Sequence, residues 1–252
     1  MRRALTAAVV AVVGLLIAAG CGADEQPTVD GLTPADGFVV EQVTAGLDGP
    51  TQATPHPDGR LVVAELNGEE NGGTGRVLAV DDDGAVEVLV TDLFKPTGVA
   101  VVGDELWILE PETLSRAPLS GGRPVPVVEG MVNNGRSQTT LTVGPDGALI
   151  YGTSGSLRGG GVVEGSGVLW SLDPDLGLTA PVASGFKNAY GHTYDDEGRL
   201  WVTEVSDGGF DGSDAPDELV AVVAGADHGW PRCVGDRVPV AEFGGAASAC
   251  QS

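Results

Sequence analysis

PDGRLVVAE, residues Pro57–Glu65, is a tight turn followed by a short apolar strand, and three later segments repeat this shape. Each repeat carries a leucine at the start of its apolar run, and the four leucines are 45, 43 and 51 residues apart. The other repeats are GDELWILE (Gly103–Glu110), PDGALIYG (Pro145–Gly152) and DEGRLWVTE (Asp196–Glu204), and the aligned leucines are Leu61, Leu106, Leu149 and Leu200. A period of about 45 residues is typical of propeller proteins, in which each repeat forms one blade.

The residues around each repeat complete a four-stranded unit. A small-residue strand such as Thr97–Val101 precedes the repeat, and a second hairpin follows most repeats, as in Arg76–Val80 and Val86–Val90. Helical periodicity is almost absent after Cys21. The sequence therefore predicts an all-β protein, a β-propeller of four-stranded blades with about four blades present.

The N-terminus has the features of an export signal. Two arginines precede an apolar run from Ala4 to Ala19, which is short for a membrane span, and Gly20 and Cys21 follow it. Ala18–Cys21 resembles a bacterial lipobox, and an ordinary signal-peptidase site is the alternative. We expect a signal peptide over 1–21 with Cys21 lipidated, a polar tether over 22–36 and the propeller domain over 37–252. The protein is then exported, either anchored by lipid outside the cell membrane or secreted.

Cysteine count and charge agree with export. Without Cys21 the chain has two cysteines, Cys233 and Cys250, and in an oxidising compartment we expect them to form a disulfide. The formal net charge of −23 makes nucleic acid and anionic headgroups unsuitable partners, so contact with a membrane is expected only through the lipid.

One loop has the composition of a cation site. Between the strand Leu200–Thr203 and the pair Asp217-Glu218, the segment Ser206–Asp217 is rich in glycine and acidic residues. Carboxylates and free carbonyls in such a loop suit calcium. A solvated acidic loop without a metal is the alternative interpretation.

Two neighbouring segments carry a family resemblance. KNAYGHTYDDEGRLWVTEV (Lys187–Val205) and DAPDELVAVVAGADHGWPRCVGDRVPVAEFGG (Asp214–Gly245) resemble the soluble glucose/sorbosone dehydrogenases, sugar dehydrogenases that use pyrroloquinoline quinone (PQQ). The likeness extends loosely from about Gly49. It implies a six-bladed propeller that holds PQQ and calcium and oxidises a small-molecule sugar at its anomeric carbon.

The resemblance also implies roles for individual residues. Lys187 and Asn188 match the family's Arg-Asn pair on the cofactor side, with lysine in place of arginine. Glu218 matches a calcium ligand, and the carbonyl donors to that calcium fall near Ser206 and Asp207.

The catalytic position departs from the family pattern. In NGRSQTTLTVGPDG (Asn134–Gly147), Arg136 occupies the position of the family's catalytic histidine, while Asp217 matches the carboxylate that orients that histidine. A guanidinium stays protonated and has no acceptor lone pair, so Arg136 cannot act as the base. It is expected either to pair with an anionic group of the quinone or to be a surface residue in a turn.

Two functions are therefore open. The first is a PQQ-dependent aldose dehydrogenase, for which we expect a longer reading frame to supply further blades, because an open ring exposes unpaired sheet edges. The second is a degenerate propeller that binds a sugar or a protein partner at the cell surface without oxidising it.

Overall fold

The computed structural model describes residues 31–206, 215–248 and 250. Met1–Gln42 and Val43–Ser252 are two separate units. In the described part of the first unit, the Phe38 backbone N–H donates to the Ala35 carbonyl over 3.0 Å. The predicted signal peptide and Cys21 lie outside the described residues. Among the residues that were described, no helix is long and apolar enough to cross a membrane.

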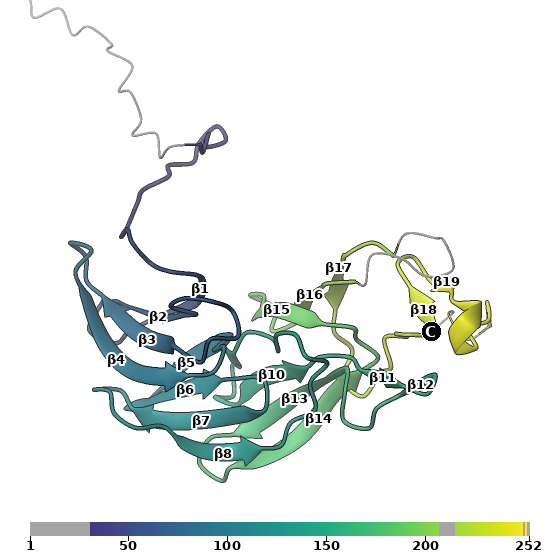
Figure 1. Cartoon of the computed structure of the whole chain (residues 1–252). Helices are drawn as coiled ribbons and strands as arrows, with labels where there is room; N and C mark the ends of the chain where they lie inside the picture. Colours follow the sequence, from purple (N-terminus) through teal and green to yellow (C-terminus); the bar gives the residue numbers. More distant parts are fainter. Residues whose placement is uncertain (1–30, 207–214, 249, 251–252) are drawn as a thin grey trace, which may run out of the picture. The chain divides into compact units, whose positions relative to one another are not determined.

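The second unit is an all-β propeller of small antiparallel sheets, as predicted (Figure 1). The first sheet runs in chain order through β1 (Pro50–Pro55), β2 (Leu61–Glu65), β3 (Gly75–Val80) and β4 (Val86–Leu93). The second sheet has the same order in β5 (Gly98–Val102), β6 (Glu105–Leu109), β7 (Thr113–Pro118) and β8 (Val125–Glu129). Each sheet is thus one blade, built by two successive hairpins.

The third and fourth blades vary this plan. The third contains β9 (Thr142–Val143), β10 (Leu149–Thr153), β13 (Val168–Asp173) and β14 (Leu178–Ser184), with a separate hairpin of β11 (Leu157–Arg158) and β12 (Gly161–Val162) inserted. The fourth is described as three strands, β15 (Ala189–Tyr194), β16 (Leu200–Glu204) and β17 (Glu218–Ala221). A two-stranded sheet of β18 (Cys233–Val234) and β19 (Val238–Pro239) and the 3-10 helix η1 (Ala241–Phe243) follow it.

Each predicted repeat is the second strand of a blade. The four aligned leucines lie in β2, β6, β10 and β16, where the apolar runs are largely buried. Apolar side chains on neighbouring blades pack against each other. One core cluster joins Val62 and Ala64 of the first blade to Val99 and Leu106 of the second, and two further clusters fill the next two interfaces. Burial between blades explains why these strands are short, apolar and repeated.

The Gln52 side chain links the first strands of neighbouring blades. The Gln52 side chain on β1 donates from Nε2 to the Leu141 carbonyl over 2.6 Å. Its Oε1 accepts from the backbone N–H groups of Val99 and Leu141, each over 2.9 Å. One glutamine thus connects β1 to the start of β5 and to the residue directly before β9.

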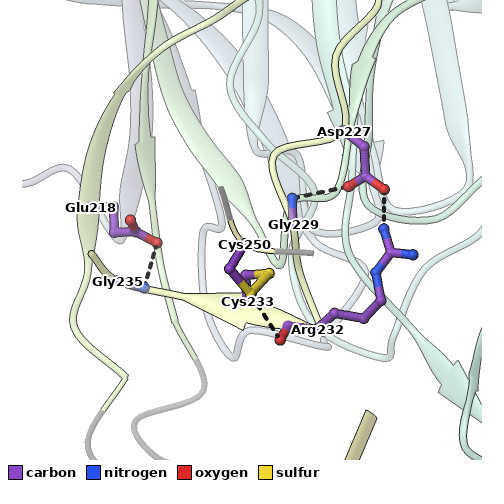
Figure 2. The surroundings of a disulfide bond; sticks show 7 residues. All are labelled: Glu218, Asp227, Gly229, Arg232, Cys233, Gly235 and Cys250. Carbon is purple, nitrogen blue, oxygen red and sulfur yellow. Dashed lines mark hydrogen bonds and ion pairs between the residues drawn. A yellow bond between two sulfur atoms is a disulfide. The ribbon is translucent and has the colours of Figure 1, made fainter. Parts of the chain in front are cut away.

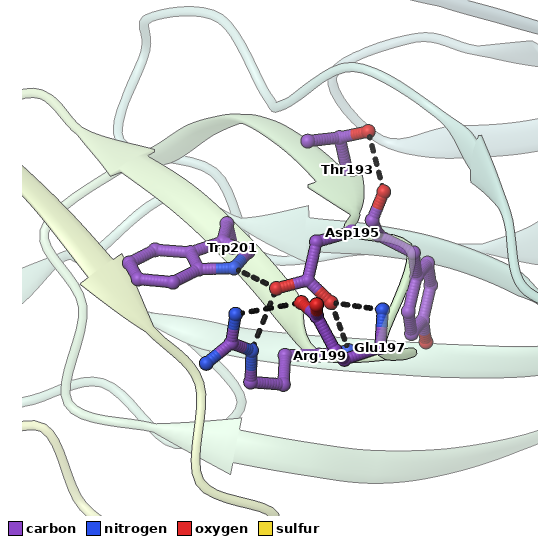
Figure 3. A network of polar contacts seen from close by, with 6 residues as sticks. Thr193, Asp195, Glu197, Arg199 and Trp201 are labelled. Atoms are coloured by element: carbon purple, nitrogen blue, oxygen red, sulfur yellow. Dashed lines mark hydrogen bonds and ion pairs between the residues drawn. The ribbon is translucent and has the colours of Figure 1, made fainter.

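Hydrogen bonds to one carboxylate hold the turn between β15 and β16 of the fourth blade (Figure 3). Asp195 accepts from the backbone N–H of Arg199 over 2.8 Å and from the indole N–H of Trp201 over 2.8 Å. The Arg199 Nε donates to the same carboxylate over 2.6 Å. The hydrogen bond from Trp201 and the contacts with Arg199 lower the pKa of Asp195 to about 2. The carboxylate therefore keeps the turn closed around neutral pH.

The predicted disulfide between Cys233 and Cys250 is confirmed, with a Cα–Cα distance of 5.7 Å (Figure 2). It joins β18 to the described residue nearest the C-terminal end of the chain. Beside it, Asp227 accepts from the Gly229 backbone N–H over 2.9 Å and pairs with the Arg232 guanidinium. These contacts hold residues 227–232, the corner after β17. This corner places Trp230 against the third and fourth blades.

Candidate functional site

A pocket of about 470 Å³ lies at one end of the blades. In an antiparallel sheet, the connection between the second and third strands and the connection to the next blade emerge at the same end. These are the connections that build the pocket. Its described lining is Glu70, Asn71, Lys95, Asn134, Gly135, Arg136, Ser137, Lys187, Asn188, Tyr190, Val205 and Ser206.

Three of the chain's few cationic side chains line the pocket. The chain has 13 lysines and arginines against 36 acidic residues, and both of its lysines, Lys95 and Lys187, line this pocket together with Arg136. Both lysines follow a phenylalanine and come shortly before the first strand of a blade. Cations concentrated in one hollow of an acidic protein attract anionic ligands by local field rather than by net charge.

Each lysine has a defined surrounding. Lys95 is buried and forms an ion pair with Glu70, whose own side chain is exposed. The hydrogen bond and the charge of Lys95 lower the pKa of Glu70, and the charge of Arg136 contributes further. The Lys187 Nζ lies 5.4 Å from the centre of the Trp230 ring, within the range of a cation–π contact.

Asn188 contributes an orphaned polar atom. Its side-chain Oδ1 is buried and has no hydrogen-bond partner among the described residues. Buried polar atoms are normally satisfied, so an unpaired amide at a pocket is a position where a ligand donor can bind. With the three cations, this amide makes the pocket suited to an anionic ligand that also carries hydrogen-bonding groups.

Carboxylates lie directly next to this pocket. Glu204, at the end of β16, accepts from the Lys187 backbone N–H over 2.6 Å and is paired across the sheet with Glu218 of β17. Burial, together with the charge of Glu218, raises the pKa of Glu204 to about 7. The Asp217 Oδ1 accepts from the Ser206 backbone N–H over 2.9 Å, and the Glu218 Oε2 accepts from the Gly235 N–H over 3.2 Å.

Four residues predicted as site residues lie together in the pocket: Arg136, Lys187, Asn188 and Ser206. Asp217 and Glu218 lie outside its described lining, and Asp217 reaches it through the bond to Ser206. Asp207 belongs to residues 207–214, which the structure does not describe. No group of three or more His, Cys, Asp or Glu side chains that could hold a metal ion occurs in the described ranges.

The sequence prediction missed Lys95, Glu70 and Glu204. The sequence does contain a signal that could have identified Lys95 as a pocket residue. It is one of only two lysines, and like Lys187 it follows a phenylalanine. Glu70 and Glu204 had none, since their importance depends on which side chain the fold places beside them. Histidine is not among the described residues that line the pocket. His192 is buried on β15, where burial lowers the pKa of its imidazole to about 4.

Comparison with solved structures identifies the fold. An aldose sugar dehydrogenase from Streptomyces coelicolor, solved in its PQQ-bound form, matches with a TM-score of 0.63 and 23% identity over 79% of this chain and 67% of its own. A glucose dehydrogenase described as a possible oxidoreductase, from Thermus thermophilus, matches with a TM-score of 0.62 and 20% identity over 81% and 70%. The PQQ domain of a Coprinopsis cinerea pyranose dehydrogenase matches with 0.56 and 17% over 74% and 51%.

These similarities show that the chain has the propeller fold of the three structures. The chain spans about two thirds of the first two structures and half of the third. No protein-family model matches the chain, and the comparison with curated proteins gave no match.

Proposed function

We propose that this protein binds PQQ and a small-molecule sugar in the pocket between the blade connections, as a sugar-dehydrogenase-like propeller. One observation carries the proposal: both lysines of a strongly acidic chain, Arg136 and the unsatisfied amide of Asn188 belong to a single pocket. PQQ is a planar anionic quinone, and this set of donors fits it. The PQQ-bound aldose sugar dehydrogenase and the PQQ domain of the pyranose dehydrogenase, which have the same fold, add support.

Different residues of the pocket would bind the charged and the hydrogen-bonding groups of such a ligand. Lys187 and Arg136 would balance its negative charge, and the Asn188 amide would accept one of its hydrogen bonds. When bound, the quinone supplies the oxidant that takes hydride from the anomeric carbon of a sugar. The protein must supply a base for the anomeric hydroxyl proton, and the residue at the expected position is Arg136.

Arg136 makes oxidation the weak part of this function. A guanidinium cannot accept a proton at working pH, and general-base catalysis is typically worth about 10²–10⁴ in rate. This residue favours a second candidate function, in which the propeller binds a sugar or a protein partner without oxidising it.

Calcium remains a prediction. Its expected ligands are Ser206, Asp207 and Glu218, from the loop between β16 and β17. The two described members are oriented by local bonds, because the Ser206 N–H donates to Asp217 and the Glu218 carboxylate accepts from the Gly235 N–H. Titration with PQQ in calcium buffer and in chelator separates a calcium-dependent site from one in which the cations are sufficient.

The catalytic prediction is tested with the whole chain, reconstituted with PQQ and calcium. We expect PQQ to bind and dye-coupled oxidation of glucose to be weak, with Arg136→His raising turnover by about tenfold or more because it restores a proton acceptor. The matched control is Arg158→His, which makes the same substitution on the β11–β12 hairpin and should leave turnover unchanged. Robust oxidation by the unmodified chain would show that Arg136 does not hold the base position.

We further propose that the propeller is a lipoprotein, with a signal peptide over 1–21, a tether over 22–36 and a propeller domain over 37–252. Stable anchoring needs two or more acyl chains or a second membrane signal. Cys21→Ser should move the protein from the membrane fraction to the medium, as followed by fractionation and by the mass of the mature N-terminus. A wild-type protein that is recovered unlipidated in the medium contradicts this proposal.

A further inference from the structure

Lys95 is the most deeply buried cation of the pocket, with 3% of its side chain exposed. Its backbone has a left-handed conformation, φ 51°, directly before Pro96. Neighbouring bonds fix this segment: the Pro96 carbonyl accepts from the Thr51 hydroxyl over 2.8 Å, and the Thr97 hydroxyl donates to the Thr139 carbonyl over 2.9 Å. Strained backbone that rigid surroundings maintain is often found at functional sites.

Glu70, the ion-pair partner of Lys95, is exposed enough for a ligand to displace it. Glu70 lies in the connection between β2 and β3, and 57% of its side chain is exposed. The loop is closed at its base, since the Asn67 Nδ2 donates to the Thr74 carbonyl over 3.0 Å and the Thr74 hydroxyl donates back to the Asn67 carbonyl over 2.6 Å. Glu70 is therefore held near the pocket while its carboxylate remains accessible to water.

Lys95 and Glu70 differ in the free energy that each loses when the ion pair separates. An ammonium group as buried as that of Lys95 needs a counter-charge, because burying it unpaired costs several kcal/mol. The exposed Glu70 carboxylate loses little on returning to water. Another carboxylate can thus replace Glu70 on Lys95 without leaving the ammonium unpaired, whereas a neutral sugar offers nothing to replace it.

We propose that Lys95 anchors the carboxylate of an organic acid in this pocket, and that Glu70 is the internal carboxylate which the ligand displaces. The inference rests on the proposed function only in its choice of ligands: the carboxylate belongs either to the quinone cofactor or to an acidic sugar of the uronic or aldonic type. In both cases Glu70 competes with the ligand and sets its affinity.

Calorimetric titration of the full chain with galacturonate, its neutral counterpart galactose, and PQQ tests the inference. Glu70→Gln removes the competitor, so we expect it to strengthen binding of galacturonate, of PQQ or of both by about five- to tenfold and to leave galactose unchanged. Glu69→Gln is the matched control. It removes the same charge from the adjacent exposed position and should change affinity by less than about twofold.

A double variant, Glu70→Gln with Lys95→Gln, removes both charges and so avoids a buried unpaired ammonium. With its fold checked by circular dichroism, it should lose the gain. A gain for galacturonate identifies an acidic sugar as the ligand, and a gain for PQQ alone identifies the cofactor; both support the anchor.

Equal effects of Glu69→Gln and Glu70→Gln, or a gain that persists in the folded double variant, overturn the proposal. Failure of both acids to bind any variant overturns it as well. PQQ binding by the wild type separately judges the proposed function, because galacturonate binding with the expected Glu70 effect can occur without it.

Discussion

Glu204 shows at the scale of one residue how the fold changes side-chain chemistry beside the pocket. It is 6% exposed at the end of β16, and its carboxyl accepts from the Lys187 backbone N–H over 2.6 Å. Burial is the largest cause of its raised pKa of about 7, and the neighbouring Glu218 adds to it. The pKa of Glu218 is also raised by burial. Of the two carboxyls, Glu204 is the one that titrates near neutral pH.

Glu204 should make the folded protein less stable as pH rises. Its folded-state pKa lies above the unfolded value of 4.5, so the folded chain binds more protons between the two values. Stability falls from about pH 4.5 to pH 7 and levels off above it, by at most about 3 kcal/mol at 1.36 kcal/mol per pKa unit. Glu204→Gln keeps the acceptor for Lys187 and should remove this loss.

Urea unfolding at pH 5 and pH 8 measures the effect. The Glu204→Gln variant is expected to be more stable than wild type at pH 8 and closer to it at pH 5. Glu129→Gln, an exposed change at the end of β8, should show no such difference between the two pH values. A Glu204→Gln variant that gains nothing at pH 8 would mean that the carboxyl is already solvated or paired in the folded state.

Residue-level prediction from sequence depended on neighbours in the chain. Lys187, Asn188 and Ser206 could be predicted as pocket residues because they lie in or beside a family motif, and Arg136 because its segment resembles the family's histidine segment. Glu204 could not be predicted as a buried acid. It ends a strand that reads as an ordinary amphipathic run, and its raised pKa depends on burial and on Glu218, which the fold places opposite it on β17.

At the scale of elements, the corner after β17 joins the third and fourth blades. The Trp230 backbone N–H donates to the Gly185 carbonyl over 2.9 Å, and the Trp230 side chain is 5% exposed. Gly155, just before β11, packs against it: a Cβ at this glycine would lie 2.7 Å from the indole ring and 2.8 Å from the Phe186 carbonyl. Position 155 requires glycine because the indole ring and the Phe186 carbonyl approach so closely. The backbone conformation at Gly155 is one that other residues can adopt.

Gly155→Ala should therefore destabilise the protein by about 1–3 kcal/mol, the usual cost of overpacking a rigid contact. Gly161→Ala on β12 is the control, because a Cβ there meets its nearest atom, the Arg158 carbonyl oxygen, at 3.9 Å. Chemical denaturation followed by tryptophan fluorescence compares the two. Equal stability of the variants would show that the indole ring shifts aside without cost.

The order of strands was predictable and the insertions were not. Turn residues and apolar runs repeat along the chain, so β2, β6, β10 and β16 follow from periodicity. The β11–β12 hairpin and the β18–β19 pair have two-residue strands. Strands this short have no alternation to detect, and the fold of the surrounding chain determines them.

At the scale of the whole molecule, the pocket exists because four blades bring their connections to one end. Its lining extends from Glu70 to Ser206, so no local segment encodes it. The repeat pattern predicts that such an end exists, and the family resemblance selects some of its residues. Lys95 and Glu70 become a pair only when β3 and β4 of the first blade pair with Gly75 opposite Leu93, which explains why sequence reasoning did not find them.

Gln52 is the side chain that most directly joins the blades into one unit. Its amide makes three bonds, to the Val99 N–H, the Leu141 N–H and the Leu141 carbonyl. Replacing it with alanine leaves three backbone groups to find water in a half-buried position. Since an unsatisfied buried group costs about 1–3 kcal/mol, we expect Gln52→Ala to lower stability by about 2–4 kcal/mol, with partial rescue by water.

Thr193→Ala is a suitable control for Gln52→Ala. It truncates an exposed side chain on the first strand of the fourth blade, where the Thr193 hydroxyl makes a single long bond among the described residues, 3.5 Å to the Tyr194 carbonyl. Unfolding in urea should show a lower midpoint for Gln52→Ala with an unchanged slope, and the wild-type midpoint for Thr193→Ala. A lower slope for Gln52→Ala would mean that one blade separates before the others, whereas an unchanged midpoint would show that packing between the blades, without this glutamine, holds them together.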